Sequence, residues 1–219
     1  SNIQKQNGAD LIINISASPF RENKFKDRVN LVRSKVNEIK IPFLYCNLVG
    51  AQDELVFDGS SFALDKNGNC ISHCKSFEED ILYTDLTSHS TKHIKYATKC
   101  EDLFNALCLG IKDYFEKTKN KEAVIGLSGG IDSAVVACIA SYALGNKSVY
   151  GVSMPSKFSS EHSKFDAEEL AKNLNINYQS ISIQNIVDKL EEELSEPFSG
   201  TSRDVSEENI QSRVRGNLL

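Results

Sequence analysis

Small and polar residues that suit phosphate binding gather between positions 126 and 133. Gly129 and Gly130 lack a Cβ atom, so the backbone there can adopt positive φ and approach an anion closely. The serine hydroxyls of the run add hydrogen-bond donors, and Asp132 offers a carboxylate to a divalent cation that bridges phosphates. The pattern predicts a phosphate-binding loop made of Gly126, Leu127, Ser128, Gly129, Gly130, Ile131, Asp132 and Ser133.

The sequence on either side of this loop predicts the elements that position it. Residues 123–125 are apolar and partly β-branched, which favours a buried strand. Residues 131–144 place Val135, Ile139 and Leu144 at helical spacing. A strand, a glycine turn and a helix aim backbone N–H groups at an anion from the positive end of the helix. The loop has no lysine, so it differs from the loop of ordinary ATPases. The alternative is a corner whose serines only cap the helix.

Composition limits the classes of protein that are compatible with this chain. It has 219 residues, a net charge of −5 and a pI near 5.5, which disfavours nucleic acid and anionic membranes as partners. No apolar run has the length of a membrane span, and the N-terminus does not resemble a signal peptide. Six cysteines without a regular framework indicate reduced thiols. We therefore expect a cytoplasmic α/β protein.

Repeated strand–helix units predict a parallel sheet in the second half of the chain. Strands are expected at 149–154 and 176–183, and helices at 167–174 and 186–194. Ligands of such sheets bind at the carboxyl ends of the strands. The phosphate-binding loop and the segment after Met154 are both expected at that edge, where they can contact one nucleotide.

The first half predicts a mixed arrangement of strands and helices. Strands are expected at 11–15 and 41–46, and a helix at 27–39. The dipeptide Asn67-Gly68 is typical of a hairpin turn. A further helix is expected over 100–116, with an apolar stripe along one side. The members of that stripe are Leu103, Leu107, Ile111, Tyr114 and Phe115.

Three motifs resemble the NAD synthetases. The loop string Ser-Gly-Gly-Ile-Asp-Ser resembles the pyrophosphate loop of N-type ATP pyrophosphatases, which cleave ATP between its α and β phosphates. The run 154–167, with the pattern Met-Pro-Ser-x-x-Ser-Ser-x-x-Ser-x-x-Asp-Ala, and the helix 207–216 resemble NAD synthetase within that group. In this resemblance Asn209 matches a position that contacts deamido-NAD, and Asp132 a position that holds Mg²⁺.

The N-terminal stretch resembles the C-terminal portion of a nitrilase-type glutaminase domain, as found in glutamine-dependent NAD synthetases. The matching segments are 14–20 and 47–59. In that family the positions of Ser18 and Lys24 contact glutamine, while the alternative reading is a helix cap and a solvated lysine. The Glu-Lys-Cys triad of the family lies upstream of the matching segments, so this chain contains no residue that we expect to be catalytic.

The resemblance implies a fold, a domain division and a reaction. It implies the C-terminal part of an αββα nitrilase-like domain at 1–85, a linker at 86–98, and a doubly wound, Rossmann-like parallel-sheet domain at 99–219. It further implies amidation of deamido-NAD with ATP, Mg²⁺ and glutamine-derived ammonia, in a homo-oligomer without nucleic-acid or membrane partners. Two alternatives remain open: another adenylylating amidotransferase with the same loop, and a nucleotide-binding fragment without turnover.

Overall fold

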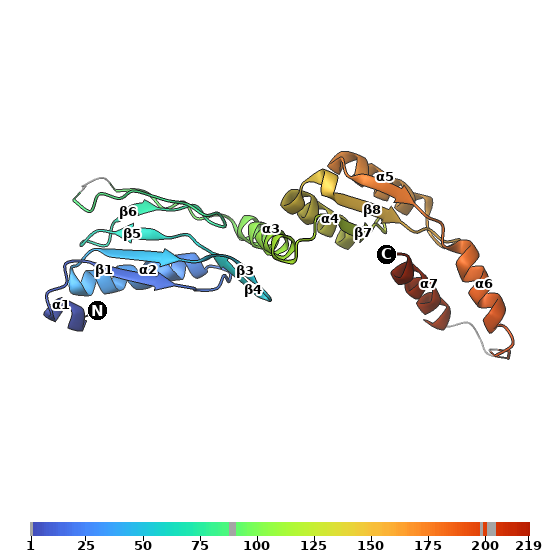
Figure 1. The fold of residues 1–219 in the computed structure, drawn as a ribbon, viewed down its shortest axis with the longest axis horizontal. Coiled ribbons are helices and arrows are strands. Elements are labelled where there is room, and N and C mark those ends of the chain that lie inside the picture. Colours follow the sequence, from blue (N-terminus) through green and yellow to red (C-terminus); the bar gives the residue numbers. More distant parts are fainter. Residues whose placement is uncertain (1, 88–90, 198, 201–204) are drawn as a thin grey trace. The chain divides into compact units, whose positions relative to one another are not determined.

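The computed structural model describes residues 2–87, 91–197, 199–200 and 205–219, and its contacts divide the chain into two units (Figure 1). Unit 1 comprises residues 1–118 and unit 2 residues 119–219. Among the helices of the described residues, none combines the length and the apolar composition that crossing a bilayer needs. Each unit is described by itself.

Unit 1 is built on a four-stranded sheet with the order β1-β2-β5-β6. After the short helix α1 (Asn2–Gln6), β1 (Ile12–Ser16) pairs in parallel with β2 (Phe43–Asn47). The strands β5 (Phe62–Leu64) and β6 (Cys70–His73) complete the sheet in antiparallel pairings. The predicted hairpin turn lies between them, where Gly68 has a φ of 82°.

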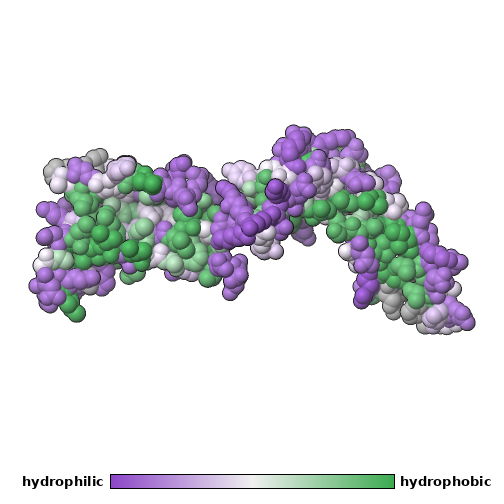
Figure 2. Space-filling view, viewed as in Figure 1, coloured by the Kyte–Doolittle hydropathy of each residue, from purple (hydrophilic) through white to green (hydrophobic). Residues whose placement is uncertain are grey.

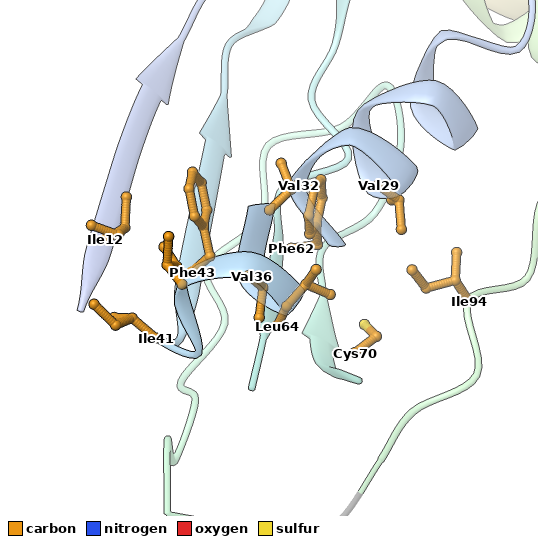
Figure 3. Packing of buried hydrophobic residues seen from close by; sticks show 11 residues of the cluster. Ile12, Val29, Val32, Val36, Ile41, Phe43, Phe62, Leu64, Cys70 and Ile94 are labelled. Carbon is orange, nitrogen blue, oxygen red and sulfur yellow. The ribbon is translucent and has the colours of Figure 1, made fainter. Parts of the chain in front are cut away.

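Helix α2 (Lys24–Ile39) covers one face of this sheet, and the core of unit 1 lies between them (Figure 3). The valines of α2 recur at helical spacing, as the sequence predicts, and are almost fully buried. Ile94, which follows the last strand of the sheet in sequence, also packs in this core. The buried cluster consists of Ile12, Val29, Val32, Val36, Ile39, Ile41, Phe43, Phe62, Leu64, Cys70 and Ile94.

The opposite face of the sheet is apolar and open. Along β1 the burial alternates, so that Ile12 is buried while Ile13 and Ile15 are 60% and 84% exposed. Apolar surface gathers over the strands of unit 1 in Figure 2. Unit 1 thus provides one helical layer and one sheet of the αββα arrangement.

The long helix α3 (Lys99–Thr118) packs against a separate two-stranded ribbon. This ribbon consists of β3 (Val49–Gln52) and β4 (Leu55–Asp58). Asp113 Oδ2 accepts a hydrogen bond of 2.6 Å from the Ala51 N–H, and Lys117 Nζ donates to the Ala51 carbonyl. This face of α3 is partly polar, and the predicted apolar stripe is buried only in part. Leu103, Leu107 and Tyr114 are exposed, whereas Ile111 and Phe115 are half-buried.

Unit 2 contains the predicted parallel sheet, with β8 (Val149–Ser153) between β7 (Ala123–Gly126) and β9 (Asn177–Ser180). Helices α4 (Ile131–Leu144) and α5 (Glu161–Leu174) pack on the sheet and on each other. The short turn η1 (Asn146–Ser148) precedes β8. The core consists of Leu127, Ala137, Ala140, Val149, Ala167, Ala171 and Ile176.

One burial prediction in unit 2 is wrong. The strand β7 is not buried throughout: Ile125 packs against the core, whereas Val124 points to the opposite face of the sheet and is 55% exposed, because successive side chains of a strand alternate between the faces. In α4 the buried positions are Ala137, Ile139 and Ala140, whereas Val135 is exposed, because the small alanines allow the helix to approach the sheet. Helices α6 (Gln184–Leu194) and α7 (Val205–Leu218) follow and pack on each other.

Candidate functional site

The predicted phosphate-binding loop, residues 126–133, has near its start a residue that is buried in the core of unit 2. Leu127 follows β7 directly and is 2% exposed, and its N–H donates to the Val152 carbonyl at 2.8 Å. Its side chain fills the space over Gly151, where a Cβ atom would lie 2.5 Å from Leu127 Cδ1. A side chain at position 151 would therefore displace Leu127 and with it the first residues of the loop.

The two serines of the loop hold it in one conformation. Ser128 Oγ and Ser133 Oγ lie 3.1 Å apart, and Ser128 Oγ accepts from the Gly130 N–H at 3.2 Å. Ser133 Oγ donates to the Gly130 carbonyl at 3.0 Å, and Gly130 is the N-cap of α4. The hydroxyls therefore order the loop internally and accept from the N–H groups of Ser128 and Gly130.

Gly129 brings the loop against the first turn of α5. It has a φ of +79°, and a Cβ atom there would lie 2.3 Å from the carbonyl oxygen of Ser163 and 2.7 Å from its Cα. Only glycine is compatible with both the backbone conformation and this approach. The turn of α5 is itself fixed by the N-cap Ser160, whose Oγ accepts from the Ser163 N–H at 3.1 Å.

A cavity of about 360 Å³ opens between the loop, the end of β8, α5 and α7. Two cations, Lys164 and Arg215, line it. Lys164 Nζ lies 2.7 Å from Glu161 Oε1, and this hydrogen bond and positive charge lower the pKa of Glu161. The full lining is Gly126, Leu127, Ser128, Ser153, Met154, Pro155, Ser159, Ser163, Lys164, Arg215 and Leu219.

Helix α7 is attached to the segment after β8 by two polar contacts. The buried Gln211 accepts from Ser156 Oγ at 2.9 Å, and Arg215 Nε donates to the Met154 carbonyl at 3.1 Å. Asn209 and Arg213 are exposed on another side of the helix, as the helical spacing predicts. Val214 is buried in a cluster with Ile183 and Val187, whereas Leu218 is 39% exposed because it lies at the end of the helix.

The structure places Asp132 in the first turn of α4, outside the lining of the cavity. Its carboxylate is exposed, and the described residues contain no group of three or more metal-binding side chains. One exposed carboxylate next to a phosphate-binding loop fits a Mg²⁺ ion that is held mainly by phosphate oxygens and water.

In unit 1 the predicted glutamine-binding segment is held by residues far away in the sequence. The Asn47 carboxamide accepts from the Ser18 N–H at 2.8 Å and donates to the Ser18 carbonyl at 3.3 Å. Arg28 Nη1 donates to the same carbonyl at 3.4 Å and forms a buried ion pair with Asp58. Arg28 Nε is buried without a partner among the described residues. The backbone of Ser18 is thus fixed from two sides.

Lys24 lies at the start of α2 and lines a cavity of about 90 Å³ that also contacts Asp58 and Ser60. Ser18 does not line this cavity. The structure therefore places the two predicted glutamine-binding residues on one segment without bringing them into a common cavity.

The family of the chain follows from comparison with known proteins. The NAD synthase family matches residues 103–219, which is more than half of the chain and includes the loop, the cavity and α7. The chain belongs to the NAD synthase family. The carbon-nitrogen hydrolase family matches residues 2–96, in agreement with the nitrilase-like arrangement of unit 1.

Relatives in the NAD synthase family match both units. The glutamine-dependent NAD(+) synthetase of Synechocystis sp. is 43% identical over 97% of this chain and 39% of that protein. The enzyme of the same name from Thermotoga maritima is 37% identical over 97% of this chain and 43% of that protein. A structure of the glutamine-dependent NAD+ synthetase from Acinetobacter baumannii, in complex with ADP, is 31% identical with a TM-score of 0.92, and covers 100% of this chain and 42% of that one. The chain spans about two fifths of the length of these relatives.

Sequence reasoning did not single out several residues that the structure adds to this site. Lys164 was not predicted because it is one of two lysines on the polar helix α5, and no local pattern sets it apart from Lys172. Asn47, Arg28 and Asp58 were missed because buried polar networks join distant positions. The motif at 154–167 was the one signal that pointed to the α5 side of the cavity.

Proposed function

We propose that this chain is part of a glutamine-dependent NAD synthetase, in which unit 2 adenylylates deamido-NAD with ATP. The observation that carries the proposal is the ordered loop of Ser128, Gly129 and Gly130 beside a cavity that is lined by Lys164 and Arg215. An anion-binding loop next to a cationic cavity suits a nucleotide with several phosphates. Relatives that carry this name match along nearly the whole chain.

The proposed reaction needs activation because a carboxylate has a poor leaving group. A carboxylate oxygen of deamido-NAD bonds to the α-phosphorus of ATP, and the bond from that phosphorus to the α–β bridging oxygen breaks. The electron pair leaves on pyrophosphate, whose charge the backbone N–H groups of the loop stabilise. The nitrogen of ammonia then bonds to the acyl carbon, the bond from that carbon to the AMP oxygen breaks, and one proton leaves the nitrogen for water, which gives NAD and AMP.

Other residues are proposed to serve the same reaction. Asp132 would hold Mg²⁺, which supplies charge neutralisation for the phosphates. Asn209, exposed on α7, would contact deamido-NAD. In unit 1 Ser18 and Lys24 would bind glutamine, since a hydroxyl and a cation suit its α-carboxylate. We further propose that the enzyme acts in the cytoplasm and as a homo-oligomer, as the resemblance to its family implies.

The experiment that tests this proposal measures AMP release from ATP and Mg²⁺ with ammonium chloride, in the presence and absence of deamido-NAD. Release that depends on deamido-NAD is the expected result. Ser133→Ala should lower it, because this hydroxyl orders the loop, whereas Ser141→Ala on the same helix should not, because Ser141 donates only to the Ala137 carbonyl.

Two other outcomes point to the alternatives. Substrate-dependent AMP release with a different acyl acceptor, and none with deamido-NAD, would favour another adenylylating amidotransferase. ATP binding without any release would favour a nucleotide-binding fragment and would contradict turnover by this chain.

A further inference from the structure

The phosphate-binding loop contains no cation of its own. Residues 126–133 include neither lysine nor arginine, yet a departing pyrophosphate carries several negative charges. The end of a helix contributes roughly half an elementary charge, which is not enough to balance them. Positive charge must therefore come from side chains outside the loop or from a metal ion.

Of the two cations that line the cavity, Lys164 is the one placed beside the loop. It directly follows Ser163, whose backbone lies so close to Gly129 that a Cβ atom there would overlap it. Arg215 differs, because its Nε already donates to the Met154 carbonyl and so holds α7 in position. The contact between Gly129 and Ser163 places Lys164 one residue from the glycine turn, and Lys164 lines the same cavity as Ser128.

The position of Lys164 is fixed while its ammonium can change partner. The Ser160 cap holds the first turn of α5 through Ser163, with their Oγ atoms 2.8 Å apart. The ammonium pairs with Glu161, whose side chain is 88% exposed. Exposed ion pairs of this kind contribute little to stability. A phosphate group with more charge and more acceptor oxygens can therefore replace Glu161.

We infer that Lys164 binds the terminal phosphates of ATP and stays on pyrophosphate as it leaves. This inference rests on the proposed function of the loop and adds to it a residue that the loop sequence does not contain. The lysine keeps its proton throughout, and it stabilises the charge that arrives on the bridging oxygen when the bond to the α-phosphorus breaks. Lys164 thereby has the role that a lysine within the loop has in ordinary ATPases.

The test compares two lysines of the same helix. Lys164→Met removes the inferred contact, and Lys172→Met is the matched control, because Lys172 pairs with Glu168 at 2.6 Å and does not line the cavity. Calorimetric titration of the chain with ATP and Mg²⁺, with inorganic pyrophosphate and with AMP gives the affinities. We expect Lys164→Met to lower affinity for ATP and pyrophosphate about tenfold or more, since charge-assisted contacts are the strong ones. AMP affinity should stay unchanged, as should all affinities of Lys172→Met.

Two further variants distinguish the loss of a phosphate contact from misfolding of the chain. Lys164→Arg should keep most of the ATP affinity, because it retains the positive charge. Glu161→Gln, at an exposed position, should increase ATP affinity because it removes the competing carboxylate.

Equal ATP affinity of Lys164→Met and the unchanged chain would overturn the inference, as would a loss that is the same for AMP as for ATP. In both cases the proposed function would stand. If the unchanged chain bound neither ATP nor pyrophosphate, the proposed function itself would fail, and the role of Lys164 with it.

Discussion

In the loop of unit 2, Ser128 and Ser133 contact each other and are five positions apart in sequence. In unit 1, by contrast, Ser18 is held by Asn47, which is 29 positions away, and by Arg28, which is ten positions away. The loop is therefore a local structure that needs its neighbours mainly for anchoring. The Ser18 segment depends on a buried network that forms only when the whole of unit 1 has folded. Damage to the core should consequently affect the two sites very differently.

The largest expected effect is loss of the buried ion pair of unit 1. Asp58→Asn leaves the Arg28 charge buried without its partner, both side chains being nearly inaccessible, and should destabilise unit 1 by about 3–5 kcal/mol. Hydrogen exchange followed by mass spectrometry should show faster exchange in peptides of unit 1 and unchanged exchange in those of unit 2. The control Asp27→Asn breaks an exposed pair with Arg21 and should cost less than about 1 kcal/mol. Equal costs of the two variants would show that the buried network does not support unit 1.

The next effect should be confined to unit 2. Gly129→Ala puts a methyl group into the Ser163 backbone at a positive φ, so the loop must move, and we expect loss of ATP binding together with about 1–3 kcal/mol of stability. Gly145→Ala is a matched control, since Gly145 has a φ of +84° and nothing lies within 4 Å of the added carbon. Titration with ATP should detect no change for this control. Loss of binding in both would assign the effect to backbone strain rather than to contact with α5.

A smaller effect is expected at the backbone of Ser18, without a change in the rest of unit 1. Asn47→Ala removes the two hydrogen bonds between the carboxamide and the Ser18 backbone, which together are worth about 1–3 kcal/mol, and a longer one of 3.5 Å to Asp58 Oδ1. The amide of Ser18 should exchange with solvent about ten times faster by NMR, as expected for a loss of about 1.4 kcal/mol. Asn30→Ala, at an exposed position of α2, should leave this rate unchanged. An unchanged rate in Asn47→Ala would mean that Arg28 alone holds the segment.

The smallest expected effect is a difference in reactivity among the cysteine thiols. Burial raises the pKa of the Cys70, Cys74 and Cys108 thiols, whereas Cys46 and Cys100 are exposed. Because the thiolate is the reactive form, a raised pKa keeps these thiols protonated to higher pH. A thiol reagent at pH 8 should therefore label Cys46 and Cys100 first. Rapid labelling of Cys70 would indicate that the core of unit 1 opens.

Much of the chain could be predicted from sequence because its features are local. The loop, the valines of α2, the Asn67-Gly68 turn and the parallel strands of unit 2 each depend on residues within one or two turns or strands. The cysteine spacing predicts reduced thiols, and the six cysteines, all of them among the described residues, form no disulfide with one another. The domain limits at 85 and 98 stay a prediction, since contacts group α3 with unit 1 while the NAD synthase match begins at residue 103.

Sequence alone therefore determined the family, the strand–loop–helix at 123–144 and the parallel sheet, because short-range spacing and backbone chemistry are sufficient for them. Tertiary structure alone decided which face of α3 is buried, that Val124 lies on an edge strand, and that Lys164 lines the cavity. It also decided that Asn47 and Arg28 hold Ser18. The physical reason is the same in each case: burial and polar pairing depend on which distant residues the folded chain brings into contact, and no local pattern encodes this.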